Sequence, residues 1–296
     1  MSVPDVWIIV LHWKELELTR RCLTALRELA YPNYHVVLVD NDSDDGSLEC
    51  IRTDFPEVHT LGLLANTGFA GGCNAGIRYA LAESADYILL LNNDTEMPPE
   101  LLRKLVHNAE VMPRLGILTP KVVWQEQPDR LYGLGGRRLP FRVKLRGMGQ
   151  RDHGPWSGPP VLLDFVFGCC MLIRSEVFEQ IGLFDTRFFM YFEDVDLCYR
   201  AADAGWTVGY LPDAVLPHIG AASTRRTGMR EFLLGRSRQL FFRKHVSGWW
   251  WLVYAVYELF YTTRYILRLL GHGHLRPAIL YMGGTLAGIV ATRAPR

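Results

Sequence analysis

Short apolar segments alternate with helix-like patterns in the first third of the chain, and this alternation restricts the possible fold more than any other feature. The apolar segments cover residues 6–11, 36–39, 58–64 and 87–91, at a spacing of roughly 25–30 residues. Continuous apolar runs of this length are typical of parallel strands that are buried on both faces. Parallel strands need a long crossover, which is usually a helix. The sequence therefore predicts an α/β fold: an open, mostly parallel sheet with helices on both faces.

Polar residues follow three of these predicted strands. They are His12 after the first strand, Asp40 after the second and Asn92-Asn93-Asp94 after the fourth. Open parallel sheets bind ligands at the carboxyl ends of their strands. Asp and Asn after a strand are also ordinary turn residues, which is the alternative explanation for any single cluster. Three clusters at one edge of one sheet favour a ligand site.

The Asn92–Asp94 triplet and His218 are candidate ligands for a divalent cation. Hard cations such as Mg²⁺ and Mn²⁺ prefer oxygen ligands and keep waters and substrate phosphates in their shell. Asp94 supplies a carboxylate, and His218, which follows a later apolar run, supplies an imidazole. Asn-Asn-Asp also forms turns, however, and a single histidine is more often structural than a metal ligand.

Three acidic residues within four positions follow five bulky apolar residues at 188–192. If Glu193 opens a helix, Val195 and Cys198 pack inward and Asp194 stays at the N-terminal end. Helix N-termini favour anionic side chains, so one interpretation is a capping cluster. The other interpretation is a general base, with the Asp194 carboxylate available to accept a hydroxyl proton.

Three further segments carry local structural signals. Residues 125–160 are rich in Gly, Pro and Arg, which predicts a long surface loop or an irregular hairpin over the sheet edge. A glycine-rich loop is expected before a helix over 75–82. Ser175 is expected to cap a short helix that ends before Gly182.

Charge divides the chain into two unlike parts. Residues 1–220 carry a net charge of −9 and residues 221–296 a net charge of +10, although the total is only +1. The near-neutral total excludes a general polyanion-binding protein, so no nucleic-acid partner is expected.

The six cysteines form no CxxC pair, which fits a reduced, cytoplasmic compartment. Asp5 precedes the first apolar run, so the N-terminus is interpreted as a strand and not as a signal peptide.

The basic tail contains a long helical pattern, residues 249–270, which Glu258, Arg264 and Arg268 interrupt. On a helical wheel these charged residues share one face and apolar residues share the other, which predicts an amphipathic helix at a membrane interface. Basic residues upstream would favour anionic lipid head groups; they are Arg225, Arg226, Arg230, Arg236, Arg238, Arg243 and Lys244. The alternative is that the apolar face packs on the preceding domain or on a second subunit, and the oligomeric state stays open.

Four ordered motifs resemble family 2 glycosyltransferases of the GT-A fold. They are Val39-Asp40-Asn41 with Gly46-Ser47, the stretch Ala65-Asn66-Thr67-Gly68-Phe69-Ala70-Gly71-Gly72-Cys73-Asn74, the stretch Leu91-Asn92-Asn93-Asp94-Thr95, and Gly182-Leu183-Phe184-Asp185 through Phe192-Glu193-Asp194-Val195-Asp196-Leu197-Cys198-Tyr199-Arg200. With His218, the fourth motif resembles the bacterial rhamnosyltransferase-like branch, which builds cell-surface polysaccharides. The resemblance covers about residues 5–225. It implies a GT-A catalytic domain over 1–224, followed by a basic, aromatic helical region over 225–296.

The resemblance also implies roles for individual residues. A nucleotide-sugar donor would lie across the parallel-strand edge, with Asp194 as the catalytic base and with Glu193 and Asn92 in support. Asp94 and His218 would hold Mg²⁺ or Mn²⁺ on the diphosphate of the donor. The nucleotide itself would be bound by Leu11, Trp13, Asp40, Asn74 and Asn93.

The implied reaction is inverting, metal-dependent hexosyl transfer from dTDP-rhamnose or a UDP-sugar to a glycan or lipid-linked acceptor, on the inner face of the cell membrane. A single displacement needs one base, unlike the two-carboxylate hydrolases. The first alternative is a catalytically silent sugar-nucleotide or polysaccharide-binding module on the same fold. A nucleotidyltransferase or diphosphate hydrolase is a third hypothesis, but such an enzyme needs more metal-binding carboxylates than Asp94 alone supplies.

Two positions depart from the family pattern. Asn92 begins a metal-binding triplet that often begins with Asp in the family. His12 and Lys14 stand in a turn that is commonly Asn-rich.

Overall fold

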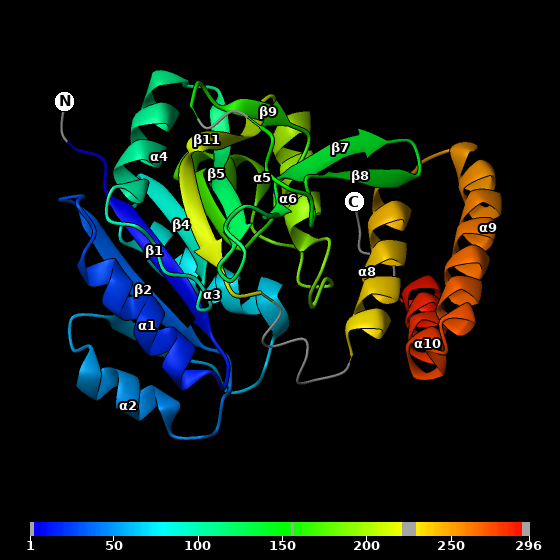
Figure 1. Cartoon of the computed structure of the whole chain (residues 1–296), viewed down its shortest axis with the longest axis horizontal. Coiled ribbons are helices and arrows are strands. Elements are labelled where there is room, and N and C mark those ends of the chain that lie inside the picture. Colours follow the sequence, from blue (N-terminus) through cyan, green and yellow to red (C-terminus); the bar gives the residue numbers. More distant parts are fainter. Residues whose placement is uncertain (1–2, 155–156, 221–228, 292–296) are drawn as a thin grey trace.

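The computed structural model describes residues 3–154, 157–220 and 229–291, and a nine-stranded sheet forms its centre (Figure 1). In spatial order the strands are β3 (His59–Gly62), β2 (Tyr34–Asp40), β1 (Val6–His12), β4 (Tyr87–Asn92), β10 (Cys170–Arg174), β5 (Leu115–Trp124), β11 (Thr207–His218) and β9 (Val161–Leu163), with β6 (Leu131–Gly133) paired to β5. The first four strands of the chain run parallel, β5 and β11 run parallel to each other, and β10 is antiparallel to both β4 and β5. The open, mostly parallel sheet expected from the sequence is confirmed.

Helices cover both faces of the sheet. The apolar side chains of α1 (Leu16–Arg27), α2 (Ser47–Asp54) and α4 (Leu101–Val111) join one core cluster. The other cluster takes in α3 (Gly68–Ala82), α5 (Ser175–Ile181), α6 (Glu193–Asp203) and α8 (Arg230–His245). Along β1, Val6 and Ile8 belong to one cluster, and Trp7 and Ile9 belong to the other. The apolar runs form strands here because each central strand is buried on both faces.

The glycine-rich stretch after β3 is helical, so the expectation of a loop before residue 75 is wrong. α3 begins at Gly68, seven residues earlier than expected. At Gly72 a Cβ atom would lie 2.4 Å from Cδ1 of Leu11, so only glycine allows α3 to approach the end of β1 this closely. The stretch therefore packs a helix against the edge where the polar clusters lie.

The segment over 125–160 contains a hairpin, which is one of the two structures predicted for it, the other being a long surface loop. The strands β7 (Gly135–Leu139) and β8 (Arg142–Arg146) pair antiparallel. Beyond the hairpin, the Asp152 carboxylate lies 2.8 Å from Nζ of Lys121 on β5, and both side chains are buried. This ion pair fastens the segment to the sheet.

Ser175 does not cap α5, which corrects the expectation from the sequence. Arg174 stands at the N-cap and Ser175 is the first helical residue, with its hydroxyl donating to the carbonyl of Ala85 at 2.5 Å. The helix ends before Gly182, which has a φ of +73°, as expected for a left-handed C-terminal glycine.

The described part of the basic tail, residues 229–291, forms α8, α9 (Trp250–Gly271) and α10 (Leu275–Val290) beside the sheet (Figure 1). α8 shares the core of the preceding domain, because Leu240, Phe241 and Phe242 belong to one of the two clusters that cover the sheet. The division at residue 224 stays a prediction, but it does not separate two independent cores. Among the described residues, no helix has both the length and the apolar character needed to span a bilayer.

The basic residues of α8 make contacts within the protein. Arg238 is buried and cannot reach a lipid head group, and for the others the expected lipid contact stays a prediction. Arg238 pairs with Glu258 of α9, Arg243 donates to carbonyls at the end of α10, and Lys244 pairs with Asp185. Arg236 donates to the carbonyl of Arg187 and Arg230 pairs with Glu231, whereas Arg225 and Arg226 lie outside the described residues.

Candidate active site

The strand register brings the polar clusters to one edge of the sheet. His12 at the end of β1 aligns with Asp40 at the end of β2, and Leu11 aligns with Asn92 at the end of β4. β11 ends at His218, which forms an isolated bridge with Thr95, next to Asp94. Residues far apart in the sequence therefore meet because their strands end at the same level.

Asp94 and His218 lie side by side, as the sequence predicted. The Oδ1 atom of Asp94 is 3.2 Å from Nε2 of His218, and both side chains are buried. Among the described residues, Oδ1 of Asp94 and Nδ1 of His218 have no hydrogen-bond partner. A buried carboxylate oxygen without a donor is costly, and a cation would satisfy it. This pair fits a divalent cation, although the described residues contain no cluster of three or more potential His, Cys, Asp or Glu ligands.

Asn92 stands next to this pair without an acidic group. Its amide nitrogen lies 3.4 Å from Nε2 of His218, and the carbonyl of Asn92 accepts a hydrogen bond from Thr95 at 2.7 Å. A cation that keeps waters and phosphate oxygens in its shell needs few protein ligands. The geometry therefore agrees with a supporting position for Asn92.

The contact of Asp40 with the nucleotide base stays a prediction, and its carboxylate lies at the end of β2. Asp40 is buried and accepts a hydrogen bond from Ser43 Oγ at 2.5 Å, while Leu11 and Trp13 are half-buried close by along the chain. His12 is fully buried between Thr19 and Ser47, each 2.7 Å from a ring nitrogen. Burial lowers the pKa of His12, and the charge of Asp40 opposes that shift. His12 thus joins α1 and α2 to the end of β1.

The two asparagines assigned to the nucleotide have other partners in the structure. Asn74 is buried, and its side-chain amide both donates to and accepts from the backbone of Phe184, at 2.8 and 3.0 Å. This arrangement fastens α3 to the segment before α6. Asn93 is half-buried and donates to Thr19 Oγ1 at 2.9 Å. Their nucleotide contacts stay predictions, and the geometry gives Asn74 a structural role.

Asp194 lies at the start of α6, which opens at Glu193 as the sequence predicted. Its carboxylate accepts hydrogen bonds from the backbone N–H groups of Gly168 and Val195, at 3.0 and 2.8 Å. Burial raises the pKa of Asp194 to about 6, although these N–H groups favour the charged form. Asp194 keeps some solvent exposure, whereas Glu193 is buried and its Oε2 has no hydrogen-bond partner among the described residues.

Cys169 connects the two acidic motifs. It follows Gly168, which holds Asp194, and its own carbonyl accepts a hydrogen bond from the N–H of Asn92 at 2.9 Å. Its thiol pKa is raised to about 12 by burial, and the charges of Asp94 and Asp194 add to the shift. Both carboxylates therefore lie within electrostatic range of the same residue, at one end of the sheet.

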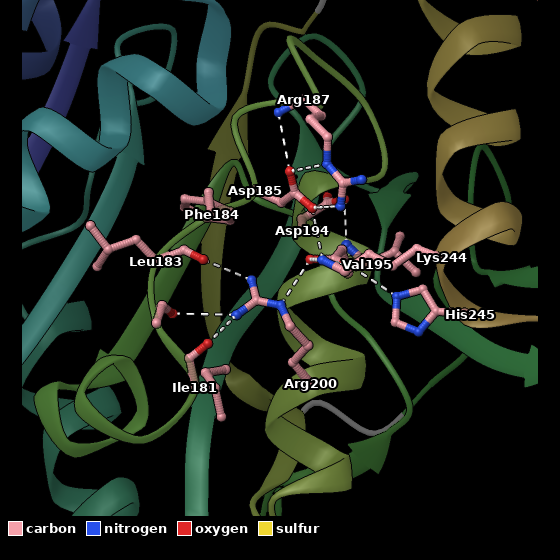
Figure 2. Close-up of polar contacts among 12 residues, drawn as sticks. Ile181, Leu183, Phe184, Asp185, Arg187, Asp194, Val195, Arg200, Lys244 and His245 are labelled. Atoms are coloured by element: carbon pink, nitrogen blue, oxygen red, sulfur yellow. Dashed lines mark hydrogen bonds and ion pairs between the residues drawn. The ribbon is translucent and has the colours of Figure 1, made fainter. Parts of the chain in front are cut away.

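Side chains of α8 form ionic contacts that support the acidic motif at the start of α6 (Figure 2). Asp196, which is fully buried on α6, lies 2.8 Å from both Nζ of Lys244 and Nε2 of His245, and Arg200 of α6 pairs with it at 2.9 Å. Lys244 also pairs with Asp185 at 2.9 Å. The cationic partners lower the pKa of Asp196 against the effect of burial. Asp185, Asp196 and Arg200 come from the motif that marked the site, whereas Lys244 and His245 come from the tail, so the tail is part of the support of the site.

Sequence reasoning missed several residues that support the site. Asn41 holds the loop before α3, because its side chain accepts from the N–H of Thr67 at 2.9 Å and donates to the carbonyl of Gly68 at 3.0 Å. Its position directly after Asp40 was the available signal. Gly168 acts through its backbone N–H, and Lys244 and His245 lie 48 or more residues after Asp196, so nothing local in the sequence marked them.

Comparison with known proteins finds relatives over most of the chain. The model of the glycosyltransferase-like family 2 matches residues 4–245. The N-acetylglucosaminyl-diphospho-decaprenol L-rhamnosyltransferase of Mycobacterium tuberculosis is 31% identical over 240 residues, which cover 73% of this chain and 76% of that protein. The dTDP-rhamnosyl transferase RfbF of Shigella flexneri is 27% identical over 271 residues, which cover 86% of each chain.

Solved structures share the fold at low sequence identity. A mannosyltransferase from Pyrobaculum calidifontis, in complex with GDP-Man and Mn²⁺, superposes with a TM-score of 0.59 at 14% identity and covers 98% of this chain and 88% of its own. GalNAc-T7 with UDP, GalNAc and Mn²⁺ gives a TM-score of 0.61 at 14% identity, over 75% of this chain and 45% of its own. With the family model matched over most of its length, the chain belongs to glycosyltransferase family 2 and has the GT-A fold.

Proposed function

We propose that this glycosyltransferase moves a hexosyl group, with inversion, from a nucleotide-diphosphate sugar to a glycan or lipid-linked acceptor in the synthesis of a cell-surface polysaccharide. The observation that carries the proposal is Asp194, a carboxylate with a raised pKa at the sheet edge that Asp94 and His218 share. The names of the relatives support a rhamnosyl donor and a lipid-linked acceptor. The donor would therefore be dTDP-rhamnose, with a UDP-sugar as the alternative.

The donor would lie across the carboxyl ends of β1, β2 and β4. Asp40 would accept a hydrogen bond from the pyrimidine base, and Leu11 and Trp13 would contact its faces. Trp13 is half-buried and retains surface for such a contact. Buried carboxylates discriminate well between ligands, because a base without the matching N–H leaves the oxygen unpaired.

Asp94 and His218 would hold a Mg²⁺ or Mn²⁺ ion near the diphosphate. Oδ1 of Asp94 and Nε2 of His218 are 3.2 Å apart, which is close enough for both to ligate one ion, and two solved GT-A structures contain Mn²⁺. A divalent cation supplies positive charge that neutralises a leaving diphosphate without proton transfer. The protein supplies the carboxylate and imidazole that fix its place.

Asp194 would act as the general base. It removes the proton of the acceptor hydroxyl while that oxygen bonds to the anomeric carbon, and the bond from this carbon to the diphosphate oxygen breaks on the opposite face. One displacement of this kind inverts the anomeric configuration. A pKa of about 6 leaves Asp194 largely ionised at neutral pH and basic enough to accept the proton.

The test is single-turnover transfer by folded, donor-saturated Asp194→Asn protein, with dTDP-rhamnose and UDP-sugars as donors. We expect turnover to fall by about 10²–10⁴-fold while donor affinity is retained, which is the pattern of an interaction made in the transition state. Glu193→Gln, a matched change at the neighbouring carboxylate, should cost less. Near-normal transfer by Asp194→Asn would remove this residue from the mechanism. Donor binding without any transfer by the wild-type protein would instead favour the non-catalytic binding module.

A further inference from the structure

The helix α9 turns Glu258 inward, toward α8, whereas Arg264 and Arg268 stay exposed. Glu258 is 7% exposed and lies 2.7 Å from Nη2 of Arg238, and Gln239 donates to its other oxygen at 2.6 Å. Thr262 donates to Glu258 at 3.0 Å, and Tyr265 donates to Glu231 at 2.8 Å. Glu258, Thr262 and Tyr265 of α9 therefore have their polar partners within the protein.

The opposite face of α9 is apolar and exposed. Its large side chains recur at helical spacing and are 42–76% exposed: Leu252, Val256, Leu259, Phe260, Leu267 and Leu270. Single exposed apolar residues are ordinary on a protein surface, but a continuous stripe of this length marks an interaction surface. The alternative considered from the sequence, in which this face packs on the preceding domain, is therefore wrong for the described residues.

α10 repeats the same arrangement. Its small or polar residues face α8, and at Gly284 a Cβ atom would lie 2.0 Å from the carbonyl oxygen of Phe232, so the two backbones are in close contact. Its large apolar residues are 47–80% exposed: Leu275, Ile279, Met282, Leu286, Ile289 and Val290. A helix that faces water has the reverse distribution. We define the exposed apolar residues of α9 and α10 as the tail face.

The charges around the tail face are all of one sign. Residues 259–291 contain no acidic side chain, whereas Arg264, Arg268 and Arg276 are exposed. Trp249 and Trp250 are exposed at the start of α9, and tryptophan is enriched where membranes meet water. Two copies of this face would bring like charges together, whereas an anionic surface complements them.

We propose that the tail face docks on an anionic lipid bilayer, with α9 and α10 lying in the interface. The contacts of the tail itself carry this inference, and it does not depend on the reaction proposed above. Apolar side chains enter the boundary of the acyl chains, while the arginines meet the head groups. Arg236, Arg238 and Lys244 of α8 are engaged within the protein, so the proposal does not depend on them.

The experiment is sedimentation of the full-length protein with vesicles of phosphatidylcholine alone or mixed with phosphatidylglycerol. We expect binding to the anionic vesicles at low salt, with affinity at least about tenfold higher than for neutral vesicles and falling as salt screens the charges. The double variant Leu259→Ser with Phe260→Ser removes two large apolar side chains from the tail face, and it should bind anionic vesicles about tenfold or more weakly than the wild type. The pair Leu64→Ser and Val111→Ser, at exposed apolar positions outside the tail, is the matched control and should bind like the wild type.

A second pair tests charge. Arg264→Gln with Arg268→Gln should lower affinity for anionic vesicles at low salt and flatten the salt dependence, whereas Arg78→Gln with Arg103→Gln, on exposed helix positions elsewhere, should change neither. Thermal unfolding verifies that each variant is folded. Failure of the wild-type protein to bind anionic vesicles overturns the proposal. A second result would also overturn the proposal. If analytical ultracentrifugation shows a concentration-dependent dimer and Leu259→Ser with Phe260→Ser abolishes that dimer, the tail face binds a second copy of the chain.

Discussion

Burial makes the carboxyl groups of Asp194 and Glu193 weaker acids than usual. It raises the pKa of Asp194 to about 6 and raises the pKa of Glu193 well above its ordinary value, with the charge of Asp194 adding to the second shift. Asp194 receives two backbone hydrogen bonds, whereas Glu193 Oε2 has no partner among the described residues. The two neighbours therefore differ in a way that helix capping does not explain.

The pH dependence of turnover tests the state of Asp194. A base must be ionised, so kcat should rise about tenfold per pH unit below pH 6 and level off above pH 7. Turnover is measured from pH 5 to 8 at saturating donor and constant ionic strength. Circular dichroism at each pH separates loss of catalysis from unfolding. A flat profile from a folded protein would contradict the assignment.

Glu193→Gln should stabilise the protein at high pH. Glu193 binds its proton more tightly in the folded chain than in the unfolded chain, so its own contribution to stability is greatest at low pH and falls as pH rises through the folded-state pKa. The variant has no charge to bury. Its free energy of unfolding should exceed that of the wild type by about 1 kcal/mol or more at pH 8, and the difference should shrink toward pH 4. Urea unfolding at both pH values measures it, with exposed Glu176→Gln as the control.

Individual site residues were predictable from the sequence where the chemistry is local. Asp94 and Asp194 stand in short acidic motifs next to a strand end or a helix start, and the structure places them there. Asn74 stood in a motif too, yet its partner is the backbone of Phe184, 110 residues away. Such a pairing depends on how α3 packs, which no local pattern encodes.

At the scale of elements, the strands were easier to predict than the start of α3. Runs such as residues 6–11 form strands because both faces of the sheet are covered, and their apolar character records that burial. The glycines of α3 suggest a loop by propensity, but close packing against β1 requires Gly72. Tertiary packing outweighs propensity at that helix, so its first turns could not be predicted.

The contact between α6 and α8 should carry much of the stability of the site. Asp196→Ala leaves Lys244 and His245 without their shared carboxylate in a buried setting, and removing one partner of such a group costs about 3–5 kcal/mol. Asp203→Ala, at the exposed end of the same helix, should cost less than about 1 kcal/mol. Chemical unfolding of both variants at pH 7 measures the difference. Equal effects would show that α8 does not support α6.

At the scale of the whole molecule, α8 connects two surfaces. It holds Asp196 and Asp185 near the candidate base, and through Arg238 it holds Glu258 of α9. The catalytic edge and the tail face are thus fixed to one helix. If the acceptor is lipid-linked and the tail face docks on a membrane, as proposed above, this connection would orient the edge where the acceptor must enter.

Ligand binding should stabilise the whole molecule, and this effect tests the cation. A nucleoside diphosphate that binds only the folded chain adds about 2.7 kcal/mol of stability at 100 times its Kd, which is a Tm rise of several degrees for a chain of this size. The rise should need Mg²⁺ or Mn²⁺ and shrink in EDTA. Asp94→Ala and His218→Ala should each reduce the rise when metal is present and barely change it in EDTA, because they act through the cation. Asp213→Ala, a carboxylate remote from this edge, serves as the control. An equal loss for Asp94→Ala with and without metal would show that the residue contacts the nucleotide by another route.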